Sequence, residues 1–169
     1  VPDDPGLLGE VANLVEAPHA LRGKFEEDYL RLPREVLVSV MKKHQRYFPV
    51  LKAGGEDGLL PYFIVVRNGD GEGEELVVEG NAAVIRARFA DADYFVRADK
   101  KLKLADYVPQ LSTLTFQKEL GSMLDKTRRV TALVDDLAPH FPLEPGEQQI
   151  ARRAAELCKA DLATHMVVE

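Results

Sequence analysis

Residues 41 to 50 read Met41-Lys42-Lys43-His44-Gln45-Arg46-Tyr47-Phe48-Pro49-Val50, and they separate an apolar run with helical spacing from an apolar run typical of a strand. We call residues 41–50 the basic–aromatic segment. Cations can contact phosphates, and aromatic or planar amide groups can contact bases, so this composition suits RNA better than a small substrate. An ordinary helix-to-strand junction can have the same composition, and both interpretations stay open.

The regions on either side of this segment predict a mixture of helices and strands. Asp4 and Pro5 are typical of a helix start, and the spacing of apolar residues predicts a helix that continues until Pro18. A second helix begins at Pro33, with Val36, Leu37, Val40 and Met41 on one face. Strands are predicted over residues 46–51 and 59–66, with a glycine-rich turn between them at residues 53–58.

Further along the chain the pattern becomes helical. Asn81 is expected to cap a long helix that runs to about Lys101 and turns Val84, Ile85, Phe89, Ala92 and Phe95 inward. Proline and hydroxyl residues interrupt the pattern at residues 104–115, where we place a domain boundary. Beyond it, residues 120–137 and 148–168 predict two antiparallel helices. The expected fold class is α+β, with a mixed domain over residues 1–111 and the start of an all-α domain, truncated, over residues 112–169.

Composition limits the classes of function. The net charge of −6 argues against a domain that binds nucleic acid over its whole surface, although clustered cations can still form local basic faces. Cys158 is the single cysteine, so no internal disulfide can form and a reducing compartment, the cytoplasm, is expected. No run is long and apolar enough for a membrane span, and no leader is recognisable. The chain lacks a starting Met and stops within an apparent helix, so we expect an internal fragment.

Three groups of cations are the candidate tRNA-binding residues. The first lies in the basic–aromatic segment, where His44, Gln45 and Tyr47 could add base or sugar contacts. The alternative is that these cations form solvated faces balanced by nearby Asp residues. The candidates are Lys42, Lys43, His44, Gln45, Arg46 and Tyr47 in the first group, Arg86, Arg88, Lys100 and Lys101 in the second, and Lys126, Arg128 and Arg129 in the third.

Neither a catalytic site nor a metal site is predicted. The histidines are scattered, and the nearest ligand pair, Asp161 with His165, is one helical turn apart, a spacing that also arises as a simple helix contact. Cys158 lies on an apolar stripe and is expected to belong to the core. The acidic glycine-rich stretch at residues 68–75 lacks the Lys and Ser or Thr of a phosphate loop, so a solvated turn is expected there.

Several separated motifs in a fixed order resemble the beta subunit of bacterial glycyl-tRNA synthetase. They are Leu7–Pro18, the basic–aromatic segment, Gly80-Asn81, Arg86–Ala92, Phe116–Ser122, Lys126–Val130 and Lys159–Glu169. One departure stands out: Ala82-Ala83 follow the Gly-Asn pair, where that family usually has Glu and a larger residue. Either any contact made by that glutamate is missing here, or the residues at these positions were altered.

The resemblance implies a two-subunit enzyme that charges tRNA with glycine. In that family the alpha subunit uses ATP, with Mg, and the beta subunit supplies most of the tRNA contacts, so this fragment is expected to be non-catalytic and to hold no cofactor. The first domain resembles the editing-type domain of the phenylalanyl enzyme's large subunit. Editing is not expected here, because glycine is the smallest amino acid and larger ones can be excluded by size.

Three functions are therefore compared. The first is a tRNA-binding segment, whose partners are tRNA, the alpha subunit and the remainder of the beta subunit. The second is a scaffold that docks subunits without touching RNA, since aromatics with Arg also suit protein interfaces. The third is a metal-dependent phosphohydrolase, which follows only from the His-Asp phosphohydrolase-like fold that the resemblance implies for the helical part. Salt dependence of RNA binding separates the first two.

Overall fold

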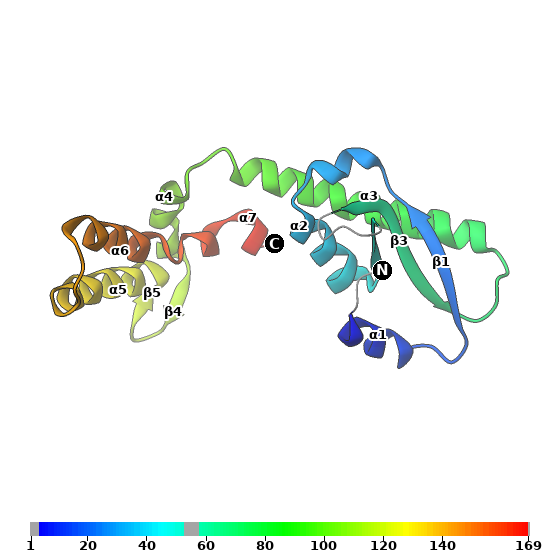
Figure 1. The fold of residues 1–169 in the computed structure, drawn as a ribbon, viewed down its shortest axis with the longest axis horizontal. Coiled ribbons are helices and arrows are strands. Elements are labelled where there is room, and N and C mark those ends of the chain that lie inside the picture. Colours follow the sequence, from blue (N-terminus) through cyan, green and yellow to red (C-terminus); the bar gives the residue numbers. More distant parts are fainter. Residues whose placement is uncertain (1–3, 53–57, 169) are drawn as a thin grey trace. The chain divides into compact units, whose positions relative to one another are not determined.

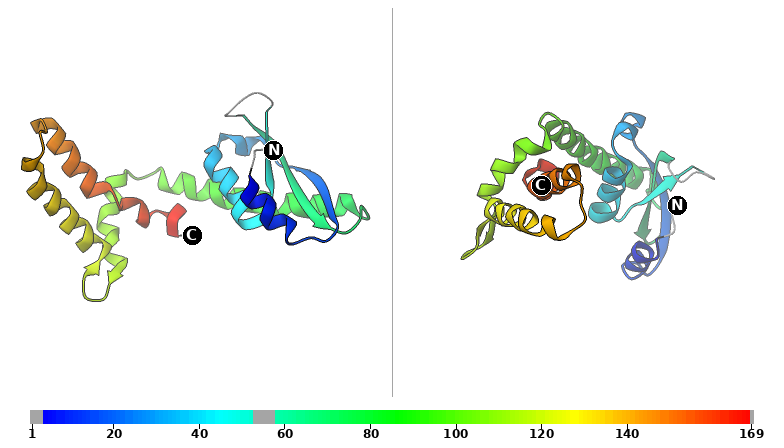
Figure 2. Two further views of the ribbon diagram at one scale, coloured as in Figure 1. Left: turned by 60° about the horizontal axis from the view of Figure 1, so that its bottom comes forward. Right: turned by 60° about the vertical axis from the view of Figure 1, so that its left-hand side comes forward.

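The computed structural model describes residues 4–52 and 58–168, and the chain divides into two compact units, Val1–Tyr94 and Phe95–Glu169 (Figures 1 and 2). The division falls inside a helix rather than after residue 111, where the composition changes. Residues 108–113 contact the helical segments that follow them, so they belong to the second unit. The predicted turn at residues 53–58 lies almost entirely outside the described residues.

The first unit is a three-stranded antiparallel sheet with helices, so the predicted α+β class is confirmed here. The sheet order is β1-β3-β2, and α3 lies along one face (Figure 1). The elements are α1 (Pro5–Ala12), β1 (Pro18–Lys24), the 3-10 turn η1 (Glu27–Arg31), α2 (Arg34–Ser39), the π-helical turn η2 (Val40–His44), β2 (Phe48–Leu51), β3 (Leu59–Asn68) and α3 (Glu74–Asp99). Strands β2 and β3 confirm the two predicted strands.

Strand β1 was not predicted, and the first helix ends earlier than predicted. Helix α1 is capped by Asp4, whose side chain accepts from Leu7 N as expected, but it stops at Ala12. The Asn68 side chain accepts from Glu16 N and Ala17 N, which directs the chain into β1. A strand is indicated by alternating apolar residues, and this alternation is incomplete in β1 because one of its inward positions is a glycine.

That glycine, Gly23, makes room for the central aromatic of the core. It pairs with Phe63 on β3, and a Cβ at this position would lie 2.0 Å from Phe63 Cζ. The Phe63 ring is fully buried and stacks on Tyr47, with 4.6 Å between the ring centroids. Closely packed interiors leave no space for the extra methyl group, so glycine is needed here for packing.

Helix α3 provides the other side of this core. Ile85 and Phe89 are fully buried, and the Phe89 ring lies 5.0 Å from the Phe25 ring. The helix begins at Glu74, so the predicted cap at Asn81 is wrong: Asn81 lies within the helix, and its Nδ2 donates to Val77 O at 2.7 Å. Val84 is 42% exposed and does not face inward as predicted.

Helix α1 covers part of the opposite face of the sheet. Leu7 and Val11 are buried against Phe48, and Ile64 and Val66 pack around them. The first unit therefore has apolar contacts on both faces of its sheet, although α1 reaches only part of the second face. The part of this face that no described helix covers carries polar residues of β1.

The second unit is mainly helical but contains a short β-hairpin, which the all-α expectation missed. The described elements are α4 (Leu104–Tyr107), η3 (Val108–Thr113), β4 (Thr115–Gln117), β5 (Gly121–Ser122), α5 (Met123–Leu137), η4 (Ala138–His140), α6 (Pro145–Leu157), η5 (Ala160–Ala163) and α7 (His165–Val168). Helices α5 and α6 pack side by side, as the two views of Figure 2 also show. The hairpin forms because Gly121 adopts φ +81, a left-handed conformation that suits glycine.

Two further expectations for this unit are wrong. The helix predicted over residues 148–168 is interrupted after Leu157, and the chain continues through η5 into α7. Cys158 is exposed rather than part of the core, and its Sγ donates to Ala155 O. None of the helices within residues 4–52 and 58–168 combines the length and apolar character that a membrane span needs.

Candidate nucleic-acid interface

The basic–aromatic segment forms a π-helical turn that ends in a left-handed residue. Tyr47 N donates to Met41 O at 2.9 Å and Arg46 N to Lys42 O at 3.1 Å, a Schellman-like cap widened by one residue. Arg46 has φ 55, a position where glycine is usual. Met41 and Tyr47 are buried on either side of this turn. The turn is therefore anchored at both ends, and the residues between are presented on a fixed support.

Tyr47 anchors the segment in the core of the first unit. Its side chain is 2% exposed, its ring stacks on Phe63, and its hydroxyl donates to Asn81 Oδ1. Burial raises the pKa of Tyr47 to about 12, because the phenolate form would lose its hydration. The Tyr47 side chain therefore lies in the core and not on the surface, where the sequence analysis expects a contact. The sequence pattern predicts a helix cap at its partner Asn81, and no sequence pattern indicates this pair.

Two of the predicted cations pair with carboxylates near or on helix α1. Lys42 forms an ion pair with Asp4, and Arg46 Nε donates to Glu10 Oε1 at 2.6 Å. The hydrogen bond from Lys42, then that from Leu7 N, holds the pKa of Asp4 below its ordinary value. These contacts connect α1 to the π turn. Lys42 and Arg46 therefore have a structural role that the sequence did not indicate.

The remaining members of the first group face solvent. Lys43 and His44 are exposed, and neither side chain makes a hydrogen bond or ion pair with another described residue. Gln45 is half-buried. Lys43 and His44 are thus the members of this segment whose polar groups are available to a ligand.

The second group of cations is divided between the two units. In the first unit, Arg86 Nε lies 2.5 Å from Glu26 Oε1, and the hydrogen bond from Arg86 is the main cause that lowers the pKa of Glu26. Arg88 is exposed and has no ion pair among the residues that the structure describes. In the second unit, Lys100 and Lys101 follow the end of α3 and are exposed.

The third group lies at the start of α5. Lys126 Nζ is 4.0 Å from the centre of the Phe116 ring on β4, which is a cation–π contact. Arg128 lies 3.5 Å from Asp125, and Arg129 is exposed. The pKa of Asp125 lies below its ordinary value, chiefly because Ser122 N and Oγ donate to it. Asp125 therefore caps α5 and partly neutralises the adjacent arginine.

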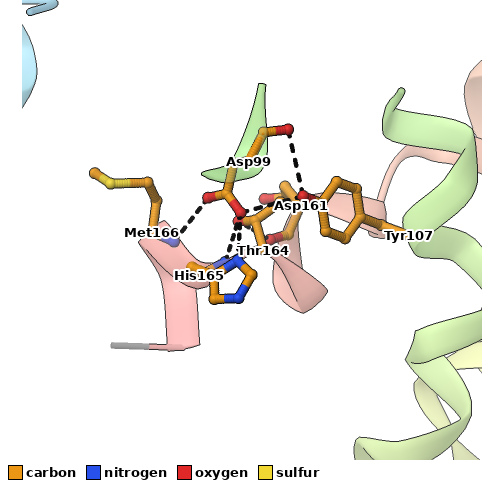
Figure 3. A network of polar contacts seen from close by, with 6 residues as sticks. All are labelled: Asp99, Tyr107, Asp161, Thr164, His165 and Met166. Carbon is orange, nitrogen blue, oxygen red and sulfur yellow. Dashed lines mark hydrogen bonds and ion pairs between the residues drawn. The ribbon is translucent and has the colours of Figure 1, made fainter. Parts of the chain in front are cut away.

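The most extensive polar network of the second unit surrounds Asp99 at the end of α3 (Figure 3). Its carboxylate accepts from His165 N and Met166 N, both at 3.0 Å, from His165 Nδ1 at 2.7 Å and from Tyr107 Oη at 3.2 Å. Burial raises the pKa of Asp99, but the hydrogen bonds from Met166, His165 and Tyr107 outweigh this, and its pKa lies below the ordinary value. Asp99 thus caps the N-terminus of α7, although 66 residues separate it from His165.

The Asp99 network changes the interpretation of His165. The sequence suggested Asp161 as its closest acidic neighbour, yet the imidazole contacts Asp99, while Asp161 accepts from Thr164 Oγ1 through its backbone oxygen (Figure 3). Burial, followed by the hydrogen bond to Asp99, raises the pKa of Tyr107. Within residues 4–52 and 58–168, no three His, Cys, Asp or Glu residues come together as a metal site would require. The network is a helix cap.

One basic–aromatic pair was missed by the sequence interpretation. Arg22 on β1 lies over the ring of Tyr62 on β3, with 5.3 Å from the guanidinium carbon to the ring centre. The two residues are 40 positions apart and come together only because β1 pairs with β3. Without β1 in the predicted fold, no sequence signal could have found this contact.

The comparisons with known proteins agree with one another. A protein-family model described as glycyl-tRNA synthetase beta subunit matches residues 1–169. The chain is 47% identical to the glycine–tRNA ligase beta subunit of Bacillus subtilis (strain 168) over 169 residues, 100% of the chain and 25% of that protein. It is 50% identical to the protein of the same name from Gloeothece citriformis (strain PCC 7424), over 98% of the chain and 23% of that protein. The chain spans about a quarter of the length of these relatives.

Proposed function

Because the chain belongs to the glycyl-tRNA synthetase beta subunit family, we propose that it is a tRNA-binding segment of the beta subunit of a two-subunit glycine–tRNA ligase. In this proposal the alpha subunit charges tRNA with glycine and uses ATP and Mg. The segment itself contributes contacts and no catalytic residue. Its partners are tRNA, the alpha subunit and the remainder of the beta subunit, and its compartment is the cytoplasm.

The exposure of Lys43 next to two buried anchors is the observation that supports this function best. Met41 and Tyr47 fix the π turn in the core, while the Lys43 ammonium and the His44 imidazole face solvent. Because the backbone that carries Lys43 is already fixed, only its side chain loses conformational freedom when the cation meets a phosphate. Arg88 is likewise an exposed cation next to a buried anchor, because the neighbouring Phe89 is fully buried in the first unit.

The paired cations have a different place in the proposal. Lys42, Arg46 and Arg86 already neutralise Asp4, Glu10 and Glu26. A phosphate would have to compete with these carboxylates, so we assign the paired cations mainly to holding the fold. Lys100, Lys101 and Arg129 are exposed and stay among the proposed contacts of the second unit. Lys126 and Arg128 are engaged by Phe116 and Asp125 and rank below them.

The experiment uses the complete two-subunit enzyme and compares two variants. Lys43→Ala with Arg88→Gln removes two unpaired cations, and Arg152→Gln with Arg153→Gln removes two cations that pair with Asp135 and Glu156. Each phosphate contact that is lost should flatten the slope of log Kd against log salt by about one. We expect weaker tRNA binding and a flatter slope for the first variant, with little change for the second.

The scaffold function is the second candidate, and exposed apolar residues favour it. Leu133, Leu137, Phe141 and Ile150 of the second unit are 45–70% exposed, and apolar surface of this kind often marks a protein interface. If the Lys43→Ala, Arg88→Gln enzyme keeps its tRNA affinity and salt slope, the tRNA proposal fails for these residues. If subunit assembly is lost in that same variant, the scaffold function is supported.

The fold relations of the two units belong to the same proposal. We assign the first unit to the mixed fold shared with the phenylalanyl enzyme's large subunit, without an editing role. We assign the second unit to the beginning of a phosphohydrolase-like helical domain, and the packing of α5 against α6 supports this. A phosphohydrolase activity is not proposed, because His165 is engaged by Asp99.

A further inference from the structure

The part of the sheet in the first unit that no described helix covers carries three residues of types that contact RNA in other proteins. Arg22 and Lys24 are successive outward-facing residues of β1, and Tyr62 lies directly opposite Lys24 on β3. The Arg22 guanidinium carbon lies 5.3 Å and Lys24 Nζ 6.0 Å from the centre of the Tyr62 ring. We call these three residues the sheet-face cluster.

This cluster lies on a fixed backbone. The residues that alternate with it, Leu21, Gly23 and Phe63, point into the core and are buried. Helix α1 covers only the neighbouring part of the same face, through its contacts with Phe48, Ile64 and Val66. The backbone beneath the cluster is therefore already ordered, and a ligand would have to order only the side chains.

The charges of the cluster are available to an anion. Arg22 is exposed, and it makes no ion pair with any carboxylate in the described part of the chain. Lys24 lies 3.6 Å from Glu27, and the two side chains are 58% and 70% exposed. An ion pair as exposed as this contributes little, so a phosphate oxygen can replace the Glu27 carboxylate at small cost.

We propose that the sheet-face cluster binds unpaired nucleotides of RNA. The Tyr62 ring and the planar Arg22 guanidinium provide surfaces on which a base can stack, and Lys24 is placed to contact a phosphate. Unpaired nucleotides fit better than a duplex, because paired bases cannot leave their stack to meet a flat protein surface. This inference goes beyond the proposed tRNA contacts, since it names a different surface and a particular form of RNA.

The test uses the full-length protein in its two-subunit enzyme and a fluorescent oligouridylate as the probe. Tyr62→Leu removes the aromatic ring but keeps an apolar side chain, and Tyr62→Phe keeps the ring. Arg22→Gln removes the charge at an exposed position, so it reports on the cluster even if Tyr62→Leu perturbs the fold. Arg153→Gln is the matched control, because Arg153 is exposed and pairs with Glu156 in the second unit.

Fluorescence anisotropy gives the dissociation constants. We expect Tyr62→Leu to weaken oligouridylate binding roughly tenfold, as expected for the loss of one stacked base, and Tyr62→Phe to bind like the unchanged enzyme. Arg22→Gln should weaken binding severalfold and flatten its salt dependence, and Arg153→Gln should do neither.

Equal affinities of the Tyr62→Leu, Arg22→Gln and unchanged enzymes would overturn the inference. If these variants bind RNA normally but the two subunits assemble poorly, the sheet-face cluster contacts a protein. That result also overturns the inference. Binding of intact tRNA by the Lys43→Ala, Arg88→Gln enzyme is measured in parallel. A loss there combined with normal oligouridylate binding by the Tyr62 variants refutes the sheet-face inference and leaves the proposed function standing.

Discussion

The two compact units bury their apolar residues in different ways. In the first unit, Phe63, Phe89, Met41 and Ile85 are fully buried between the sheet, α3 and the π turn. In the second unit the fully buried residues are fewer and smaller among those described, and large residues such as Ile150 and Leu133 are 70% and 56% exposed. The first unit thus has the larger buried core, although Leu76 and Leu8 are 75% and 61% exposed, whereas the hairpin of α5 and α6 leaves much of its apolar surface exposed.

Both units use helix caps as well as ion pairs. In the second unit, Asp99 caps α7, Ser122 and Asp125 cap α5, Glu144 with Glu147 caps α6, and Arg152 of α6 pairs with Asp135 of α5. The first unit uses ion pairs to attach peripheral segments to a finished core, as Arg46 does with Glu10. A cation of the first unit that is not used in this way is therefore a better candidate for a ligand contact.

The largest expected effect compares the same residue type in both units. Ile85→Ala should destabilise the first unit by about 3 kcal/mol, because it leaves a cavity in a closely packed core. Ile150→Ala should change stability by less than about 0.5 kcal/mol, since that side chain is exposed. Hydrogen exchange of the full-length protein measures both, and the amides of β3 and α3 should exchange about a hundredfold faster in Ile85→Ala.

The expected small effect of Ile150→Ala is the part of this comparison that tests whether Ile150 is exposed in the full-length protein. If Ile150→Ala accelerates exchange in α5 and α6 as strongly as Ile85→Ala does in α3, then Ile150 is covered in the full-length protein. The difference in apolar exposure between the two units would then not hold in the full-length protein, and the scaffold function would gain support.

Sequence reasoning succeeded where the local pattern was complete. The strands β2 and β3, the helix after Pro33 and the cap at Asp4 follow from apolar spacing and turn residues. It failed where a distant contact decides the local structure. Gly23 weakens the strand pattern of β1 because Phe63 needs the space, and the break before α7 depends on Asp99, far away in the sequence.

The candidate site shows the same limit. Composition drew attention to the basic–aromatic segment, and Lys43 and His44 are exposed as a ligand-binding role requires. Composition could not separate them from Lys42 and Arg46, because the carboxylates of Asp4 and Glu10 come close only in the folded chain. Nor could it show that Tyr47 faces the core, since an aromatic residue at a helix end can point either way.

The next largest effect concerns the helix cap of the second unit. Asp99→Asn keeps the shape of the side chain but removes the charge that accepts from His165 N and Met166 N. We expect the amides of His165 and Met166 to exchange about tenfold faster at neutral pH, because a cap of α7 is weakened. Amides of the first unit should not change, which tests whether the two units are stabilised independently.

The pH dependence of the Asp99 cap follows from its pKa. Since the folded pKa of Asp99 lies below its ordinary value of 3.8, its contribution is fully present above that value and is lost as the pH falls through the folded pKa. The difference between Asp99→Asn and the unchanged protein should therefore be constant near neutral pH and disappear in acid. A difference that persists unchanged in acid strong enough to protonate Asp99 would show that the charge is not the cause.

The smallest expected effect tests why an arginine occupies the left-handed position at the end of the π turn. Arg46 has φ 55, a conformation that costs a residue with a Cβ about 1 kcal/mol relative to glycine. Its ion pair with Glu10 joins side chains that are 49% and 51% exposed, and such pairs contribute at most about 1 kcal/mol.

Arg46→Gly loses the ion pair and relieves the backbone, so the two effects should cancel to within about 0.5 kcal/mol. Arg46→Ala loses the same pair without relief and should be about 1 kcal/mol less stable than Arg46→Gly in chemical unfolding. If both variants are equally destabilised, the left-handed conformation costs a residue with a Cβ little at this position, and the lost ion pair between Arg46 and Glu10 accounts for the destabilisation.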